Sequence, residues 1–165
     1  MKTLVLLRHI KSGKLTPVPD FERTIVEERR PDMNKVTAAL RNTKFSPERI
    51  LSSPSVRTRQ TAEAFCTEYG LNSEQVTYID NLYEASLEDI VEALKTLPDS
   101  VNNVVIVGHN PSITEAANRL SNARVDNVPT CGVVGIHFDG NSWKEALSQR
   151  GQLIFFFAPK LLSIE

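Results

Sequence analysis

The sequence is poor in cysteine, balanced in charge and free of long apolar runs. Cys66 and Cys131 are its two cysteines. They lie far apart and fit no metal-ligand spacing, so we expect no disulfide framework, a reducing compartment, and two small apolar residues rather than nucleophiles. The 19 Lys and Arg residues offset 20 Asp and Glu residues, which leaves a formal net charge of −1. That balance argues against a protein that coats nucleic acid or a membrane surface.

The apolar stretches are too short for a membrane span or a signal peptide. None approaches the roughly 20 residues that a spanning helix needs, and the first ends after a few residues at Arg8 and His9. The sequence also contains no internal repeat, low-complexity tract or linker. With 165 residues, 41% of them hydrophobic, we expect a single cytoplasmic domain over residues 1–165.

What the sequence does contain is an alternation of strand and helix patterns. Apolar or alternating runs predict strands at Thr3–Leu7, Arg49–Ser52, Gln75–Ile79, Asn103–Val107, Val133–Phe138 and Leu153–Phe157. Helices are predicted at Met33–Leu40, from Ser53 and Pro54 to Gly70, over Leu87–Leu94, and after His109, where Asn110 and Pro111 or Ser112 with Glu115 can cap the helix. This order predicts an α/β domain with a mostly parallel sheet flanked by helices. The last two strands follow each other without a helix, which leaves room for an antiparallel strand at one edge.

Two of the three histidines follow predicted buried strands. His9 ends the first strand and His109 ends a later one, so both imidazoles are expected at the rim where ligands bind to open α/β sheets. Arg8 precedes His9, and Arg57 lies near the start of a helix that follows another strand. Arginines and helix N-termini together form an anion site. A neutral imidazole there can attack phosphorus while the arginines and the second histidine hold the developing charge, without a metal.

Each of these residues also has a structural explanation when taken alone. A histidine at a strand end is commonly a hydrogen-bonded surface group, and Arg57 a solvated helix residue; the joint placement favours a site. A zinc hydrolase that uses His9, His109 and a carboxylate is disfavoured, because the arginines repel a cation and no H-x-x-H or C-x-x-C spacing occurs. A non-catalytic phosphate-binding regulatory module is an open alternative. His137, which alternates within a strand, is interpreted as structural.

Four segments resemble the motifs of one protein family. They are LLRHIKS, SSPSVRTRQTA, LYEAS and VGHNPSITEAANRLS, in that order along the chain. Together they resemble the histidine phosphatase superfamily, which has the phosphoglycerate-mutase-like fold, and within it the small bacterial SixA-type phosphohistidine phosphatases, whose opening motif reads R-H-A-K-S. The segment PTCGVVGIHFDGNSW is similar to the late strands of that branch. The resemblance spans almost the whole chain.

The resemblance implies a role for each matching residue. His9 would be the nucleophile that becomes phosphorylated. Arg8 and Arg57 would clamp the phosphoryl group, and His109 would contact it and stabilise the transition state. Neither a metal nor a cofactor is implied.

Two further residues are candidates of a different kind. Glu84, in LYEAS, lies where many superfamily members keep an acidic proton donor, although a glutamate just before a helix is otherwise a solvated residue. An alkoxide leaving group needs such an acid, whereas an imidazole leaves more readily, so Glu84 does not decide the substrate. Ser12 can donate to the phosphoryl group or cap local backbone.

The chain departs from the pattern of this branch at three positions. Ile10 stands where the branch usually has alanine, and we expect its larger side chain to narrow the site. Thr24 and Arg29 replace a proline and a glycine in DFERTIVEERRP, a segment that we expect to edge the pocket.

The sequence therefore predicts a metal-independent phosphatase that works through a phosphohistidine intermediate. The short chain indicates few inserted lid elements and an open rim, which suits phosphohistidine in a protein. Small phosphomonoesters, such as sugar phosphates or nucleotides, are the alternative substrates. The expected partner is thus a phosphorylated protein or a small phosphate ester, and neither nucleic acid nor a membrane. No pattern in the sequence indicates an oligomeric state.

Overall fold

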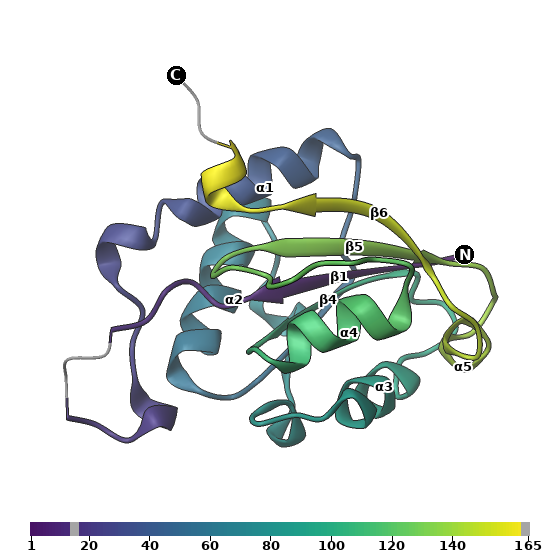
Figure 1. Ribbon diagram of the computed structural model, residues 1–165, viewed down its shortest axis with the longest axis horizontal. Helices are drawn as coiled ribbons and strands as arrows, with labels where there is room; N and C mark the ends of the chain where they lie inside the picture. Colours follow the sequence, from purple (N-terminus) through teal and green to yellow (C-terminus); the bar gives the residue numbers. More distant parts are fainter. Residues whose placement is uncertain (14–16, 163–165) are drawn as a thin grey trace.

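A mixed six-stranded sheet forms the centre of the protein (Figure 1). The structure, a computed structural model, describes residues 1–13 and 17–162. The strands are β1 (Lys2–Arg8), β2 (Arg49–Ser52), β3 (Val76–Tyr78), β4 (Asn103–Gly108), β5 (Val133–Phe138) and β6 (Gln152–Phe157). They are ordered β3-β2-β4-β1-β5-β6, with β5 antiparallel to both of its neighbours and the remaining pairs parallel. The predicted α/β class is confirmed, and the antiparallel pairings lie at one side of the sheet.

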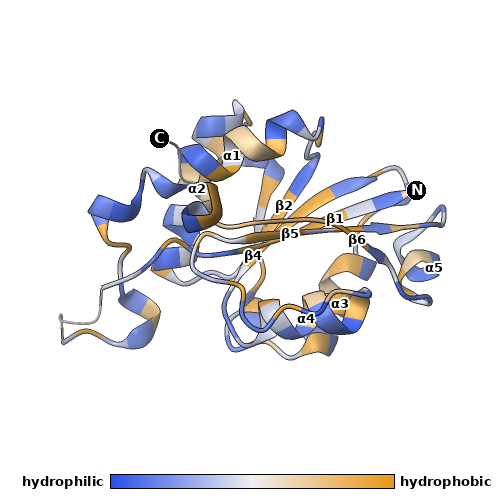
Figure 2. Cartoon of the chain, turned by 45° about the horizontal axis from the view of Figure 1, so that its top comes forward, coloured by the Kyte–Doolittle hydropathy of each residue, from blue (hydrophilic) through white to orange (hydrophobic). Residues whose placement is uncertain are grey.

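In the described residues, five α-helices cover the two faces of the sheet. They are α1 (Asp32–Asn42), α2 (Val56–Tyr69), α3 (Leu87–Lys95), α4 (Ser112–Leu120) and α5 (Trp143–Leu147). In Figure 2, α1 and α2 lie above the sheet, and α3, α4 and α5 lie below it. Of the helices in the described residues, none is long and apolar enough to cross a membrane.

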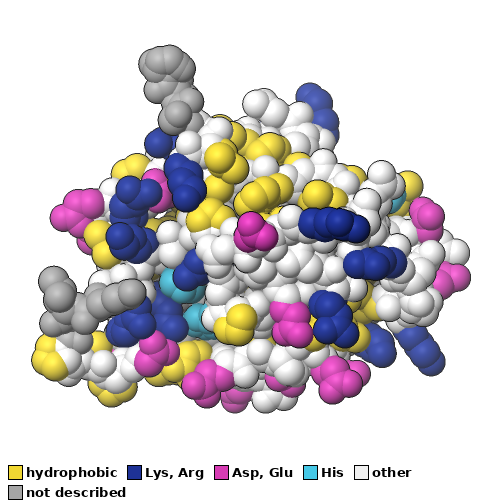
Figure 3. Space-filling model, in the orientation of Figure 1, with side chains coloured by type: hydrophobic (Ala, Val, Ile, Leu, Met, Phe, Trp, Pro, Cys, Tyr) yellow, Lys and Arg dark blue, Asp and Glu magenta, His cyan; other side chains and the backbone are white. Residues whose placement is uncertain are grey.

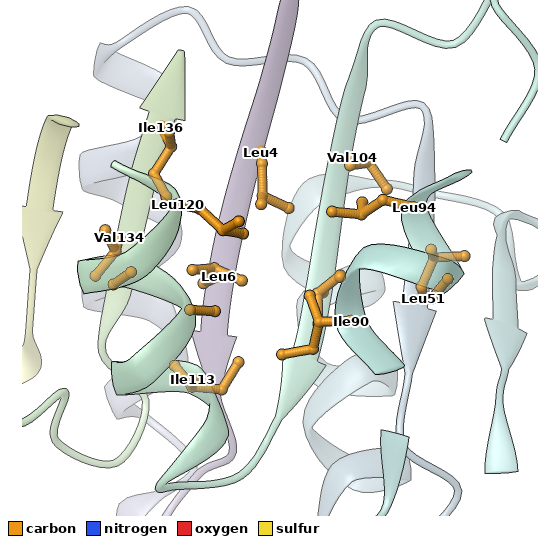
Figure 4. Close-up of a cluster of buried hydrophobic side chains, with 14 of the residues drawn as sticks. Leu4, Leu6, Leu51, Ile90, Leu94, Val104, Ile113, Leu120, Val134 and Ile136 are labelled. Carbon is orange, nitrogen blue, oxygen red and sulfur yellow. The ribbon is translucent and has the colours of Figure 1, made fainter. Parts of the chain in front are cut away.

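Strand β1 contributes to the core on both faces of the sheet. Leu4 and Leu6 pack in the cluster that includes Ile113 of α4, as Figure 4 shows, whereas Val5 and Leu7 pack on the side of α1 and α2. All four strand residues are fully buried. Burial on two faces explains why this strand is apolar throughout instead of alternating.

Helix α2 begins later than predicted. The expected start is at Ser53 and Pro54, but the first helical residue is Val56. The N–H of Ser53 still donates to the carbonyl of Val107 in β4 (3.0 Å), so the backbone at this point extends the sheet. The predicted end at Gly70 is confirmed, since this residue closes the helix with a left-handed φ of 69°.

The connection between β5 and β6 contains a helix that the sequence analysis missed. A bend at Gly140 and Asn141 is followed by α5, which has only five residues. So short a segment cannot display a helical period. It is held by Trp143, which is buried and donates its indole N–H to the carbonyl of Val101 (2.9 Å).

Asn110, rather than Ser112, caps α4. The Asn110 side-chain oxygen accepts the backbone N–H of Thr114 (3.2 Å). The Ser112 hydroxyl instead donates to the carbonyl of His109 (2.9 Å). Of the two caps that the sequence allows, the one that includes Asn110 therefore supplies the side-chain acceptor.

Residues 11–31 connect β1 to α1 as a long loop in their described parts, while positions 14–16 lie outside the described residues. It holds short 3-10 turns at Asp20–Glu22 and Glu27–Arg29. Ser12 forms an isolated antiparallel bridge with Ile25, so the loop folds back beside the end of β1.

Ile10 does not narrow the site, contrary to expectation. Its side chain is fully buried in the core on the side of α1 and α2, and its N–H donates to the Thr61 hydroxyl (2.9 Å). Arg29 lies in a 3-10 turn and pairs with Asp32 (2.9 Å). A 3-10 turn has negative φ, so this backbone does not require the glycine that Arg29 replaces.

Candidate active site

The register of the sheet brings the two predicted histidines together. Arg8 of β1 lies opposite Gly108 of β4, and a histidine follows each of them. The N–H of His9 donates to the carbonyl of Gly108 (3.1 Å), and the ring centroids of His9 and His109 are 5.4 Å apart. Figure 3 shows histidine side chains in a hollow edged by Lys and Arg side chains. Parallel strands that end side by side thus bring both imidazoles to one rim, as predicted.

A cavity of about 500 Å³ opens at this rim. Four cationic side chains line it, namely Arg8, Lys11, Arg23 and Arg57. The other lining residues are His9, Ser12, His109, Asn110, Asn127, Pro129 and Thr130. No Asp or Glu occurs among these described lining residues, so the cavity attracts an anion and repels a metal cation.

Three buried nitrogen atoms of the lining residues lack a hydrogen-bond partner within the part of the chain that the structure describes. They are Nε of Arg8, Nε of Arg57 and Nδ1 of His109. Buried polar atoms are nearly always paired, so three such atoms around one cavity indicate a ligand site. An oxyanion, which offers several acceptor oxygens, fits this set of donors.

Arg57 is buried near the start of α2 and is held from the loop. Its Nη1 donates to the carbonyl of Asp20 (2.7 Å), and its Nη2 donates to Asp20 Oδ2 (3.0 Å). Asp20 also accepts from Nη1 of Arg23 (2.8 Å) and from the Tyr83 hydroxyl (2.6 Å). The Tyr83 hydrogen bond, with help from Arg57, lowers the pKa of Asp20 to about 2, so its carboxylate is ionised.

His9 is held in a state suited to nucleophilic attack. Its Nδ1 lies 2.7 Å from the carbonyl oxygen of Ile10. Because a carbonyl can only accept, Nδ1 carries the hydrogen and Nε2 keeps its lone pair. Burial, together with the nearby charges of Arg57 and Arg8 and against the hydrogen bond to Ile10, lowers the pKa of His9 to about 4. The imidazole of the free protein is therefore neutral at physiological pH.

His109 faces His9 from the end of β4. Its Nε2 lies 2.8 Å from the Ser53 hydroxyl, at the end of the neighbouring strand β2. Burial, aided by the charge of Arg57, lowers the pKa of His109 to about 3. When the Ser53 hydroxyl donates to Nε2, Nδ1 carries the hydrogen, and this neutral imidazole can donate to an anion.

The low pKa of His9 predicts a fold that is sensitive to acid. A histidine whose pKa is 6.5 in the unfolded chain and about 4 in the folded protein costs stability as the pH falls from 6.5 to 4, because the unfolded chain binds the proton more readily. For His9 we expect a loss of about 2 to 3 kcal/mol in the free energy of unfolding between about pH 7.5 and pH 4.5. Urea denaturation of the wild type and of His9→Gln at both pH values measures it.

The glutamine variant keeps a neutral polar side chain. Between about pH 7.5 and pH 4.5 its free energy of unfolding should therefore fall by about 2 to 3 kcal/mol less than that of the wild type. His137→Gln is the matched control, because His137 is partly exposed on β5 and lies away from the cavity. An equal loss in the wild type and in His9→Gln would contradict the low pKa of His9.

Five of the six predicted site residues line the cavity, namely Arg8, His9, Ser12, Arg57 and His109. Ser12 is buried, and its hydroxyl oxygen accepts from Arg23 Nη2, which leaves its hydrogen available to a ligand. Glu84 does not line the cavity: it is exposed and follows Tyr83 with a left-handed φ of 57°. Its role as a proton donor stays a prediction.

Residues that the sequence analysis did not single out complete the site. Lys11 and Arg23 line the cavity, Asp20 accepts from Arg23 and Arg57, and Tyr83 donates to Asp20. The expectation that DFERTIVEERRP edges the pocket is confirmed by Arg23, and LYEAS contains Tyr83. The motif segments were thus the signal in the sequence that could have pointed to these residues. The individual contacts could not be predicted, because Asp20 is 37 residues from Arg57 and 63 from Tyr83 along the chain.

The chain is similar to plant and bacterial proteins over almost its whole length. An uncharacterised chloroplastic protein of Arabidopsis thaliana is 30% identical over 161 residues, which are 91% of this chain and 72% of that protein. A solved SixA protein of Agrobacterium tumefaciens is 27% identical, with a TM-score of 0.79 over 96% of this chain and 98% of that chain. The protein histidine phosphatase SixA, solved with tungstate, has a TM-score of 0.83 at 20% identity over 98% of this chain and 99% of its own. No family model matches the chain.

The sequence motifs, the fold and these similarities agree. Three of the four motif segments supply side chains to one cation-lined cavity, and the fourth supplies Tyr83, which binds Asp20 beside it. The similarity in sequence and in fold covers nearly the entire chain. The chain therefore belongs to the histidine phosphatase superfamily, in its SixA-type branch.

Proposed function

We propose that this protein removes the phosphoryl group from phosphohistidine in another protein, through a phosphorylated His9. The observation that carries the proposal is the set of nitrogen atoms of Arg8, Arg57 and His109 that have no hydrogen-bond partner among the described residues and that surround the neutral imidazole of His9. A phosphoryl group has three oxygens that can accept from these donors. Bound there, it turns its phosphorus toward the lone pair on Nε2 of His9.

The first step is transfer of the phosphoryl group to the protein. A bond forms between Nε2 of His9 and phosphorus as the bond between phosphorus and the substrate nitrogen breaks. Arg8 and Arg57 hold the charge on the three equatorial oxygens, and His109 donates to one of them. The carbonyl of Ile10 stabilises the positive charge that the His9 ring acquires, through its hydrogen bond to Nδ1.

The second step returns His9 to its starting state. Water attacks phosphorus from the open side of the cavity, and the bond to Nε2 breaks. The electron pair of that bond returns to Nε2. One proton of the water stays on the new oxygen and the other passes to the product or the solvent, so orthophosphate leaves.

The cavity favours a leaving group that needs no acid from the protein. No carboxylic acid occurs among its described lining residues, and Asp20 beside it is ionised. An alkoxide leaves only when it receives a proton, whereas phosphohistidine can carry a proton on its second ring nitrogen and leave as neutral imidazole. This difference supports phosphohistidine over alkyl phosphates. Glu84 is our proposal for the acid that an ester substrate would use.

A comparison of two kinds of substrate tests the proposal. We expect kcat/KM for a protein that carries phosphohistidine to exceed that for a sugar phosphate or a nucleotide by about 100-fold or more. Glu84→Gln should leave the first value unchanged and lower the second. Release of orthophosphate measures both, and Glu88→Gln, an exposed change on α3, controls for lost charge.

Turnover of the small phosphomonoesters alone would contradict phosphohistidine as the substrate and favour a small-molecule phosphatase. Binding of orthophosphate without turnover of any donor would contradict the catalytic proposal and favour a regulatory module.

A further inference from the structure

The guanidinium of Arg57 binds Asp20 of the loop before α1, and Arg57 also lines the cavity. Its Nη1 and Nη2 both donate to Asp20, at 2.7 Å and 3.0 Å, while its Nε is buried without a partner among the described residues. A guanidinium can grip an oxyanion at two points along either of two edges, Nη1–Nη2 or Nε–Nη2. Asp20 occupies the first edge, which leaves the second for an anion in the cavity.

Asp20 also lies between two cations that line the same cavity. Its Oδ1 accepts from Arg23 at 2.8 Å, and its Oδ2 accepts from Arg57. Without a carboxylate between them, the two guanidinium groups would repel each other. Asp20 therefore holds together the cationic wall that an anion would bind.

The Asp20 carboxylate is itself held from a third element. The Tyr83 hydroxyl donates to Oδ2 at 2.6 Å. The Tyr83 ring packs edge-on against Phe21, at a centroid distance of 5.0 Å, and against His109, at 5.5 Å. One carboxylate thus joins the loop, the start of α2 and the turn before α3.

We propose that Asp20 is a positioning residue for the arginines that bind the phosphoryl group. Asp20 holds the Nη1–Nη2 edge of Arg57, so that the Nε–Nη2 edge faces the anion, and it keeps Arg23 beside Arg57. This inference rests on the proposed function, because it takes the anion to be a phosphoryl group. Asp20 acts through Arg57 and not on the phosphoryl group itself. A displacement of about 1 Å at such a contact can cost about 100-fold in rate.

Two variants at position 20 separate positioning from charge. Asp20→Asn and Asp20→Ala remove the same negative charge, and both keep the backbone carbonyl that accepts from Arg57 Nη1. Only asparagine keeps a side-chain oxygen that can accept from Arg57 Nη2. An effect of charge alone, such as tighter binding of anions, is therefore common to both variants. The difference between them reports the position of Arg57. Glu22→Gln and Glu22→Ala are matched controls, since Glu22 is an exposed acid in the same 3-10 turn.

We expect kcat on a phosphohistidine protein to be about 30-fold lower in Asp20→Ala than in Asp20→Asn, and orthophosphate binding to be about tenfold weaker. Calorimetric titration with orthophosphate measures the binding, and the Glu22 variants should keep wild-type values. Equal kcat and equal orthophosphate affinity in the two Asp20 variants would overturn the inference. Because the titration needs no turnover, a wild type without phosphatase activity would defeat the proposed function and still leave the role of Asp20 measurable.

A double-mutant cycle tests whether Asp20 acts through Arg57. Arg57→Lys keeps the charge but loses the two edges of the guanidinium. We expect Asp20→Ala to cause no further loss of kcat or of orthophosphate affinity in Arg57→Lys, and additive losses would overturn the inference. Should Asp20→Ala fail to fold, Tyr83→Phe takes its place. It frees one side of the carboxylate and keeps the ring against His109, and an unchanged kcat in this variant would also overturn the inference.

Discussion

His9→Ala is expected to abolish the phosphorylated form of the protein and to lower turnover by about 10⁴-fold or more. Nε2 of His9 keeps its lone pair because Nδ1 is bound to the carbonyl of Ile10, and burial beside Arg8 and Arg57 keeps the ring neutral. His109 cannot replace it, because its Nε2 is engaged with Ser53.

A trapping experiment measures this effect directly. Wild type and His9→Ala are incubated with a labelled phosphodonor and quenched in alkali, and acid-labile phosphate on the chain is counted. His137→Ala is the control, because it removes a histidine that does not line the cavity. Label on the wild type and on His137→Ala, but not on His9→Ala, is the expected result. Turnover that persists in His9→Ala without any label would end the covalent mechanism.

Arg8→Ala is expected to lower kcat/KM by about 10³-fold, and Arg8→Lys to recover only a small part of the loss. The Nη1 of Arg8 is anchored on the carbonyl of Val128 at 3.0 Å, and its buried Nε has no partner among the described residues. The guanidinium is therefore held at one end and can donate to the phosphoryl group at the other. An ammonium group is a point charge and cannot do both.

Matched changes at Arg119 control for charge and size. Arg119 is exposed on α4, does not line the cavity and forms a 3.8 Å ion pair with Glu115, so its alanine and lysine variants should keep wild-type kcat/KM. Burial and the charge of Arg57 lower the pKa of Arg8, so the folded protein gains little from this cation. We therefore expect the Arg8 variants to melt no lower than the wild type. Full activity in Arg8→Lys would show that charge alone suffices at this position.

The residues that were predicted correctly are those whose surroundings follow from local pattern. The apolar run of β1 requires burial on two faces, and a strand buried in this way ends at the rim where ligands bind. The same reasoning holds for β4, so the sequence pattern assigns His9 and His109 to one site. Gly70 could be assigned to the end of α2, because a left-handed residue there favours glycine.

The predictions that were wrong concern contacts between distant segments. Ser53 extends the sheet through its hydrogen bond to Val107, and α2 begins only at Val56. Ile10 was expected to narrow the site, but its side chain is buried in the core on the side of α1 and α2. Such outcomes depend on which neighbour each segment meets, and local pattern does not contain that information.

The order of strands and helices, the two histidines at the rim and the family motifs follow from the amino-acid pattern, because periodicity and strand ends are local properties. Which charged side chains meet depends instead on the three-dimensional fold. It joined Asp20 to Arg57 and Tyr83, and it left Glu84 exposed outside the cavity. Charged side chains interact through space over a few ångströms, so their pairing depends on how the loops fold and not on their distance along the chain.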